Sequence, residues 1–338
     1  CKELPSGTVI HQQSFIYTGR YLDESYSNNA LAVENQKYFN TKEILNNYVN
    51  IYFTFPEKAG HVRKSSTSNS LIRKMNYPFK RPYKNLEKRL ETLEPVIMNI
   101  ENALSSVSGF AIKRMDDTEL NNAVYDYLNQ SYEKPVRDAS TERVNPMSVS
   151  NHDEVKIGDQ HIAVLSLTQE GESVREMCRP AVPQIQSEVE MPERITSPCS
   201  MCYPVGLGLT FDHIVNCIIE VLDVDQTKAA ISSERRSLNF ISPFYAEAAE
   251  AQLEQKRFEE EVTKNEWQTT STAFNIILKD SDPKSLMRNI SVAQQAFSSM
   301  AQSSCYVENA ETLNLFFSSM PGNAHANYRG FINISQLA

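Results

Sequence analysis

The sequence predicts an α/β (α+β) fold in which two mixed sheets are flanked by long helices. Stretches in which apolar and polar residues alternate, as in strands, are separated by longer stretches with an apolar residue at every third or fourth position, as in helices. The order strand, long helix, strand, helix occurs in both halves, which predicts pseudo-duplicated β-α-β-α units. With 338 residues, 41% of them hydrophobic, the chain can bury the cores of two such units.

Local patterns predict the elements of the first half. Alternation of apolar and polar residues predicts strands over residues 10–17, 48–55 and 109–115. Apolar residues that share one helix face predict helices over residues 31–39 and 86–104. Pro95 lies inside the second helix, where we expect a kink or a restart because proline lacks an N–H group. Asp116 or Asp117 is the expected N-cap of a further helix that contains Tyr127.

The next part of the chain begins with a predicted hairpin over residues 154–169, which turns at Gly158 and Asp159. Residues 174–203 are rich in proline and are expected to be extended and irregular. Alternation then predicts a strand over residues 214–222. Residues 228–262 are predicted to be helical with an interruption at Pro243.

Residues 271–323 have the pattern of a complete α/β module. Strands are predicted over residues 272–278 and 305–308. Between them, Asp282 and Pro283 are the expected N-cap and first position of a helix. Asn309 is expected to cap a second helix, and the Met-Pro-Gly-Asn turn at residues 320–323 ends it.

These elements divide the chain into three predicted segments. An N-terminal α/β subdomain spans residues 1–135 and carries a basic loop at residues 58–83. Residues 136–205 contain a polar linker, the hairpin and the proline-rich segment. Residues 206–338 form a second α/β subdomain.

Charge is distributed unevenly along the chain. The net charge is −9, which argues against a surface built throughout for nucleic acid, but residues 58–89 hold ten Lys and Arg against one acid. Here Lys80, Arg81, Tyr83 and Lys84 interleave cations with an aromatic ring. That pattern suits contact with single-stranded DNA or with an anionic membrane surface. A solvated loop without a ligand is the alternative.

The sequence contains no strong catalytic or cofactor motif. The pattern Gly-x4-Gly-Lys-Ser/Thr is absent, so this polypeptide alone is not expected to hydrolyse ATP or to hold a cofactor. Cys199 and Cys202 form a Cys-x-x-Cys pair and are weak metal candidates, because a tetrahedral zinc site needs two further ligands. Cys217 and His213 have a spacing that suits a nucleophile and its base, but at four residues apart on a strand they are ordinary core neighbours.

The sequence also indicates in which cellular compartment the protein is expected. Its longest apolar stretch, residues 214–222, is far shorter than the ~20 residues of a membrane-spanning helix. No signal-peptide pattern opens the chain, and six irregularly spaced cysteines favour a reducing compartment. The chain begins at Cys1 without Met, so we interpret it as a fragment. The glutamate-rich stretch over residues 247–261 is interpreted as a solvent-facing helix or a docking surface for a basic partner.

Residues 313–323, Leu-Asn-Leu-Phe-Phe-Ser-Ser-Met-Pro-Gly-Asn, resemble the end of the N-terminal domain of type IV secretion conjugation ATPases. In that family a helix runs into a hydrophobic-Pro-Gly-Asn turn shortly before the nucleotide-binding core. The likeness is greatest to the TraG-type ATPases of conjugative transposons in Bacteroidetes, and it extends over residues 158–167 and 203–217. The residues that match the turn, as structural positions only, are Pro321, Gly322 and Asn323.

The resemblance implies a non-catalytic N-terminal domain, cut before the P-loop domain, that acts in docking and assembly on the secretion channel. It further implies a full-length parent that binds ATP and Mg²⁺, forms a hexamer and energises conjugative DNA transfer and pilus assembly. The implied location is cytoplasmic, peripheral to the inner membrane. The alternative is a free-standing α/β adaptor or protein-binding module without an ATPase. A third hypothesis is a cysteine-dependent hydrolase that uses Cys199, Cys202 or Cys217.

Overall fold

The computed structural model describes thirteen stretches of the chain: residues 4–20, 30–40, 42–55, 82–105, 112–132, 144–150, 154–167, 208–241, 243–265, 268–298, 305–309, 311–327 and 331–335. The described strands are β1 (Val9–Arg20), β2 (Glu43–Thr54), β3 (Met147–Ser150), β4 (Glu154–Ile157), β5 (Gln160–Leu167), β6 (His213–Val221), β7 (Gln268–Asp280), β8 (Cys305–Glu308) and β9 (Phe331–Ser335). The described helices are α1 (Ala30–Phe39), α3 (Pro82–Ser105), α4 (Asp117–Asn129), α6 (Val224–Ile241), α7 (Ala246–Asn265), α8 (Pro283–Ser298), α9 (Thr312–Ser318) and the 3₁₀ turn η2 (Ala324–Ala326).

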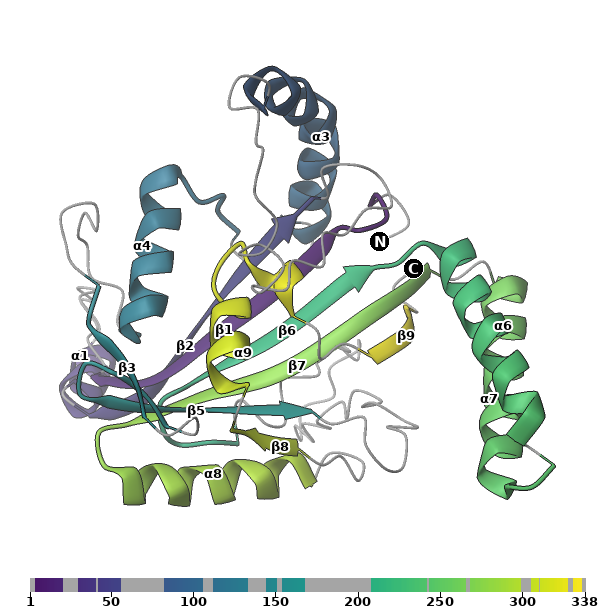
Figure 1. Ribbon diagram of the computed structural model, residues 1–338. Coiled ribbons are helices and arrows are strands. Elements are labelled where there is room, and N and C mark those ends of the chain that lie inside the picture. Colours follow the sequence, from purple (N-terminus) through teal and green to yellow (C-terminus); the bar gives the residue numbers. More distant parts are fainter. Residues whose placement is uncertain are drawn as a thin grey trace.

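The described strands form one antiparallel sheet, in the order β2-β1-β6-β7-β5-β4-β3, with β8 paired to β5 and β9 paired to β7 (Figure 1). The α+β fold class is therefore confirmed. The prediction of two mixed sheets is wrong, because β1 from the first half pairs along eight residues with β6 from the second half. All three predicted segments thus contribute strands to the same sheet.

The duplicated β-α-β-α arrangement is also not formed. Residues 112–115, part of the third strand predicted in the first half, are irregular and lead into α4. Two of their side chains make surface ion pairs: Lys113 with Glu119 at 2.6 Å and Arg114 with Glu94 at 2.9 Å. Residues 109–111 lie outside the described stretches. In the second half, β7 and β8 both pair with β5, so they are not adjacent to each other.

Several helix boundaries follow from the expected caps. Asp116 accepts a hydrogen bond from the Glu119 N–H, and the Glu119 side chain accepts one from Asp116 N–H, which forms a complete capping box at the start of α4. Asp282 accepts from the backbone N–H groups of Lys284 and Ser285 and begins α8. These two predictions are confirmed.

Other boundaries differ from the expectation. The helix that follows Asn309 has Glu311 and not Asn309 as its N-cap. The Thr312 hydroxyl in its first turn donates to the Asn309 carbonyl at 2.9 Å. The expected restart at Pro95 does not occur, since α3 is continuous from Pro82 to Ser105. The expected break at Pro243 does occur, between α6 and α7.

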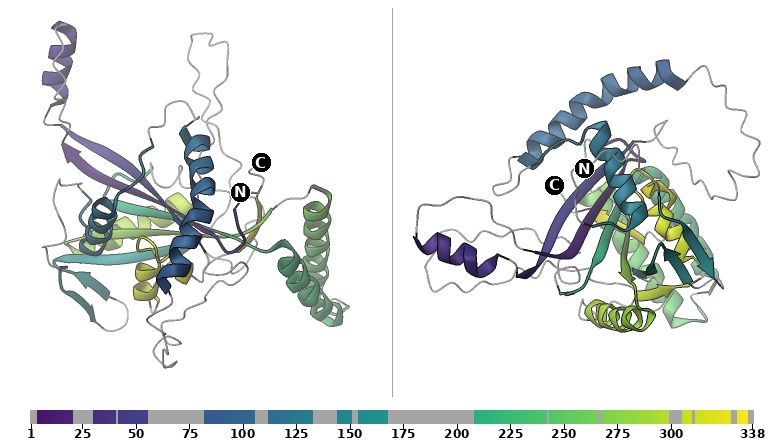
Figure 2. Two further views of the ribbon diagram at one scale, coloured as in Figure 1. Left: turned by 90° about the horizontal axis from the view of Figure 1, so that it is seen from above. Right: turned by 90° about the vertical axis from the view of Figure 1, so that its left-hand side faces the viewer.

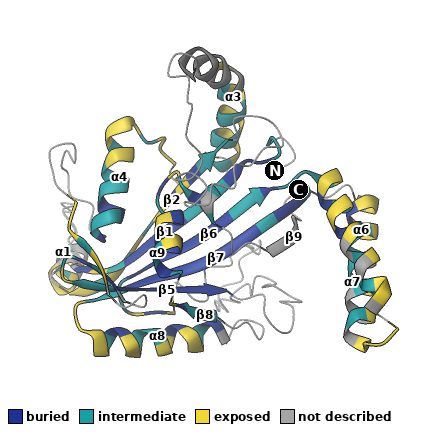
Figure 3. Cartoon of the chain, viewed as in Figure 1, coloured by how far each residue is buried: buried dark blue, intermediate teal, exposed yellow. Residues whose placement is uncertain are grey.

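Helices cover both faces of the sheet. On one face, Leu286, Ala293 and Phe297 of α8 pack with Val215 and other apolar residues of the central strands. On the other face, Leu315 and Phe316 of α9 pack with Phe15, Ile214 and Tyr127 of α4. Figure 3 shows the central strands as the most buried part of the chain, while α6 and α7 are largely exposed.

Candidate functional site

A line of polar side chains crosses the middle of the sheet at right angles to its strands. We name it the polar row, and its members, in the order β2, β1, β6, β7, β5, are Asn50, Gln13, Asn216, Asn275 and Ser166. Each is the direct cross-strand partner of the next, so all lie on one face of the sheet. Each side chain is at most 4% exposed. Burial of five polar groups side by side is costly unless they bond to one another.

Hydrogen bonds connect the centre of the polar row. The Gln13 side-chain amide donates to Asn216 Oδ1 at 2.9 Å, and the Asn216 amide donates to Asn275 Oδ1 at 2.8 Å. His11, one pleat along β1, lies with its Nε2 3.0 Å from the same Asn216 oxygen. Because that oxygen is an acceptor, Nε2 carries the proton. Burial lowers the pKa of His11 from 6.5 to about 4, so the ring is neutral at pH 7.

The polar row holds the turn that carries the family resemblance. Gln13 also donates to the Ser319 carbonyl at 2.9 Å, and the Asn275 amide donates to the Ser319 hydroxyl at 3.0 Å. Ser319 follows the last residue of α9 directly. The polar row therefore fixes the end of α9 and the start of the turn against the central strands.

The turn itself has the geometry that its sequence predicts. Pro321 is buried, and Gly322 has φ +78°, a left-handed conformation that glycine adopts without strain. The Asn323 side chain donates back to the Phe317 carbonyl at 2.8 Å and so satisfies one of the terminal carbonyls of α9. These three predicted positions act in the architecture of the turn.

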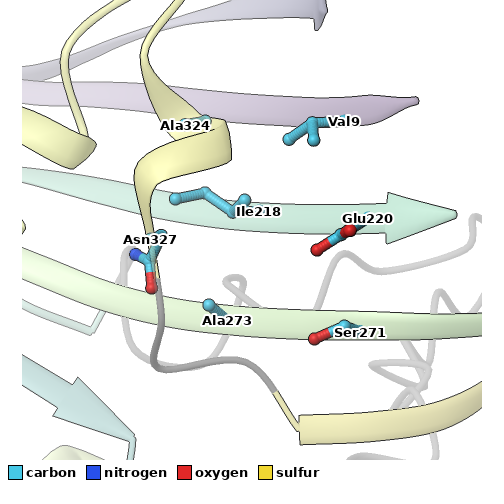
Figure 4. A pocket seen from close by; sticks show the side chains of 7 residues that line it. All are labelled: Val9, Ile218, Glu220, Ser271, Ala273, Ala324 and Asn327. Carbon is cyan, nitrogen blue, oxygen red and sulfur yellow. The ribbon is translucent and has the colours of Figure 1, made fainter. Parts of the chain in front are cut away.

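A small pocket lies on the same face, next to the polar row. Figure 4 shows the side chains that line it, from β1, β6, β7 and the η2 region, with Glu220, Ser271 and Asn327 as the polar ones. Its volume is about 10 Å³. A space of this size accommodates one water molecule and no larger ligand. This pocket is therefore too small for a nucleotide.

Three buried polar atoms of this region have no hydrogen-bond partner among the described residues: His11 Nδ1, Gln13 Oε1 and Ser166 Oγ. Gln13 and Ser166 belong to the polar row, and His11 contacts its member Asn216. The groups are a neutral imidazole, an amide and a hydroxyl, with no buried carboxylate in the row. The bonds that the polar row makes beyond its own members include two to Ser319, so it positions the backbone at the end of α9.

The cysteine and histidine that could have formed a nucleophilic pair lie on the opposite face. Cys217 is buried in the apolar cluster beneath α8. His213 is also buried, and its Nδ1 is 2.7 Å from the Phe211 carbonyl. The neighbouring Asp212 accepts from the Thr18 N–H and pairs with Lys279. A thiol in this position has no open approach for a substrate.

The remaining predicted site residues fall outside the described part of the chain or at its edge. Lys80, Arg81, Cys199 and Cys202 are among the residues that the structure does not describe. Tyr83 and Lys84 belong to the first turn of α3, where only the backbone is described. Among the described residues, no cluster of His, Cys, Asp and Glu side chains has the arrangement of a metal site.

The helical region that was predicted with a break at Pro243 forms a helical hairpin, which we name the arm. It consists of α6 and α7, which lie side by side and extend away from the ends of β6 and β7 (Figures 1 and 2). Three aromatic residues at its tip are mostly exposed: Phe240 (78%), Phe244 (80%) and Tyr245 (64%). The available sequence signal was three aromatics around Pro243, at the break of a long polar helical region.

No model of a known protein family and no curated protein matches this chain. Within the described stretches, every helix is too short or too polar to cross a membrane.

Proposed function

We propose that this chain is the non-catalytic N-terminal region of a TraG-type conjugation ATPase and acts in docking and assembly on a type IV secretion channel. The observation that supports it is the segment at residues 313–323, which carries the resemblance to that family. It forms a helix followed by a Pro-Gly-Asn turn whose proline is buried, and Ser319 connects that turn to the polar row. A helix that ends in a fixed turn is the element that would precede a nucleotide-binding core.

In this proposal the chain makes protein–protein contacts, and the ATPase activity belongs to another domain of the parent protein. ATP and Mg²⁺ belong to the P-loop domain of the parent, which would form a hexamer and energise conjugative DNA transfer and pilus assembly. The chain would lie in the cytoplasm, peripheral to the inner membrane, with other secretion components as its partners. Its exposed arm provides a surface for such contacts.

The basic segment at residues 58–89 is proposed as a second contact, with single-stranded DNA or an anionic membrane. The test measures binding of the chain to a single-stranded oligonucleotide and to phosphatidylglycerol vesicles over a range of salt concentrations. The variant K80A/R81A/K84A should bind more weakly than the control K256A/R257A/K264A, which removes the same charge from α7. Failure of the unmodified chain to bind either probe would exclude this contact.

The alternative function is a free-standing adaptor without an ATPase, and the exposed arm suits it equally well. The parent reading frame past residue 338 separates the two. A Gly-x4-Gly-Lys-Ser/Thr pattern within the next hundred or so codons would support the ATPase proposal. A stop codon soon after residue 338 would leave the adaptor. If the ATPase proposal is correct, deletion of the coding region for residues 1–338 should abolish conjugative transfer.

A further inference from the structure

The strand β2 lies at one end of the described strand order, next to β1 (Figure 1). It pairs with β1 along all twelve of its residues, and the register is constant from Glu43 opposite Arg20 to Thr54 opposite Val9, so the pair contains no β-bulge. Among the described strands, β1 is its only partner. Within the described sheet, the backbone N–H and C=O groups that β2 directs away from β1 are therefore not used.

The sequence of β2 lacks the features that usually protect an edge strand from pairing with another chain. Protected edge strands are short, carry Lys or Pro, or are interrupted by a bulge. β2 has twelve residues, about twice the usual length of a strand, and it contains no Lys, Arg, Pro or Gly. Its only charged residue is Glu43, at the end of the strand. Such an edge favours the addition of a further strand.

The side chains of β2 differ between its two faces. Leu45, Val49 and Ile51 lie on the face opposite the polar row and are exposed by 38%, 46% and 42%. On the face of the polar row, Asn50 and Tyr52 are buried, and the Asn50 amide donates to the Tyr52 hydroxyl at 3.0 Å. A strand added beside β2 would cover the apolar side chains through cross-strand contacts and leave the buried face as it is.

The sequence of β2 is complementary to itself about Val49. In an antiparallel pair of two copies with a two-fold axis at this residue, each residue lies opposite the one that is equally far from Val49 on the other copy. Leu45 then lies opposite Phe53, and Val49 lies opposite Val49. Glu43 falls outside the paired residues 44–54, so no like charges meet, although each chain has a net charge of −9. The residues of β2 therefore specify a second copy of the chain as the partner.

We propose that two copies of this chain pair through β2, antiparallel and with a two-fold axis at Val49, so that one sheet continues across both copies. The backbone hydrogen bonds of the new strand pair fix the direction of the contact. The apolar side chains on either side of Val49 supply affinity by leaving water. This contact goes beyond the function proposed above and applies to the ATPase and to the adaptor alike.

The first part of the test measures the mass of the purified chain by sedimentation equilibrium, where we expect the unmodified chain to form dimers. V49K and V49E should each weaken dimerisation by at least about tenfold, because residue 49 of one copy faces residue 49 of the other and like charges meet. An equimolar mixture of V49K and V49E should restore the dimer, since opposite charges then meet. The control variants V292K and V292E on α8, where Val292 is 41% exposed, should dimerise like the unmodified chain.

The second part locates the two-fold axis by cross-linking. Residues directly opposite each other in an antiparallel pair have Cα atoms about 4.5–5.5 Å apart, a distance that a disulfide spans. V49C should therefore form a disulfide between two copies under mild oxidation, which peptide mapping assigns to residue 49, and V292C should not.

Three results would overturn the proposal. They are a monomeric unmodified chain, a mixture of V49K and V49E that stays monomeric, and a V49C thiol that links only to another cysteine of its own chain. The last result would show that a different segment of the chain covers β2. None of these measurements depends on the reading frame past residue 338, so this proposal and the proposed function fail separately.

Discussion

The side-chain amide of Gln13 lies 2.9 Å from the backbone carbonyl of Ser319, 306 positions further along the chain. The same amide group donates to Asn216 in the neighbouring strand. One residue of β1 therefore joins the centre of the sheet to the turn after α9. The turn that carries the family resemblance depends for its position on a residue near the other end of the chain.

Replacement of Gln13 by Leu should lower the free energy of unfolding by about 1–3 kcal/mol, because the Ser319 carbonyl and the Asn216 oxygen lose a buried donor. Urea unfolding followed by circular dichroism measures the loss. Gln12 on the same strand provides the control, since its side chain lies on the opposite face and is half-buried. Equal losses in Q13L and Q12L would show that the polar row does not stabilise the fold.

The stability of the chain should fall between about pH 6.5 and pH 4 through His11. Its pKa is about 4 in the folded state and 6.5 in the ordinary state, so the unfolded chain binds a proton in this window that the folded chain does not. The contribution is complete above pH 6.5 and is lost as the pH falls, by about 3 kcal/mol in total. In H11Q this part of the pH dependence should disappear, as measured by urea unfolding at several pH values. An unchanged pH profile in H11Q would contradict the prediction.

Tyr127 connects α4 to α9, because its hydroxyl donates to the Phe316 carbonyl at 2.5 Å and its ring stacks on the Phe316 ring at 4.9 Å. Y127F should cost about 1–2 kcal/mol, since the buried carbonyl loses its donor while the packing is kept. Y127A should cost about 3–5 kcal/mol, because it also opens a cavity. Thermal unfolding checks the order, with Y38F on the exposed face of α1 as a control that should change little. A Y127F variant as stable as the unmodified chain would exclude a role for this hydrogen bond.

Gly322 should tolerate asparagine better than alanine. Apart from its two chain neighbours, no described residue has an atom within 4 Å of the position that a Cβ would take, so the expected cost of substitution comes from the left-handed backbone at φ +78°. G322A should lose about 1–2 kcal/mol, and G322N less, because asparagine adopts this conformation more readily. Chemical unfolding of the two variants measures the difference. The opposite order would indicate a steric cause, which the structure does not support.

Cys217 and Cys305 should resist alkylation in the folded chain. Cys217 is buried in the core, and burial raises the pKa of Cys305 to about 12, so almost no thiolate is present at pH 7. Iodoacetamide labelling of these two residues, followed by mass spectrometry of their peptides, should become rapid only in denaturant. Fast labelling of Cys217 in the folded chain would revive the hypothesis of a cysteine-dependent hydrolase.

Sequence patterns predicted caps and turns correctly where all the residues that form them lie within one short segment. The capping box at Asp116, the N-cap at Asp282 and the turn at Gly158 each depend on residues a few positions apart, and all three formed as predicted. The strand predicted over residues 109–115 had the right alternation, but its described part, residues 112–115, pairs with no strand. Alternation alone does not supply a partner.

Strand β2, at one end of the described strand order, also shows that alternation does not predict which side of a strand is buried. β2 has an alternating pattern that places its apolar side chains Val49 and Ile51 on one side of the strand. They are 46% and 42% exposed, while Asn50 and Tyr52 between and beside them are buried. β2 pairs only with β1 among the described strands, so which of its sides is covered depends on the layer above the sheet.

The sequence by itself determined the helices and turns, the break at Pro243, the basic segment at residues 58–89 and the α+β class, because these depend on local spacing, caps and composition. Only the tertiary structure decided that both halves share one antiparallel sheet and that five polar residues align across it. It alone placed three aromatic residues in water at the end of the arm. Strand register and burial are set by contacts between residues as far apart as Gln13 and Asn216, whose separation leaves no periodic trace in the sequence.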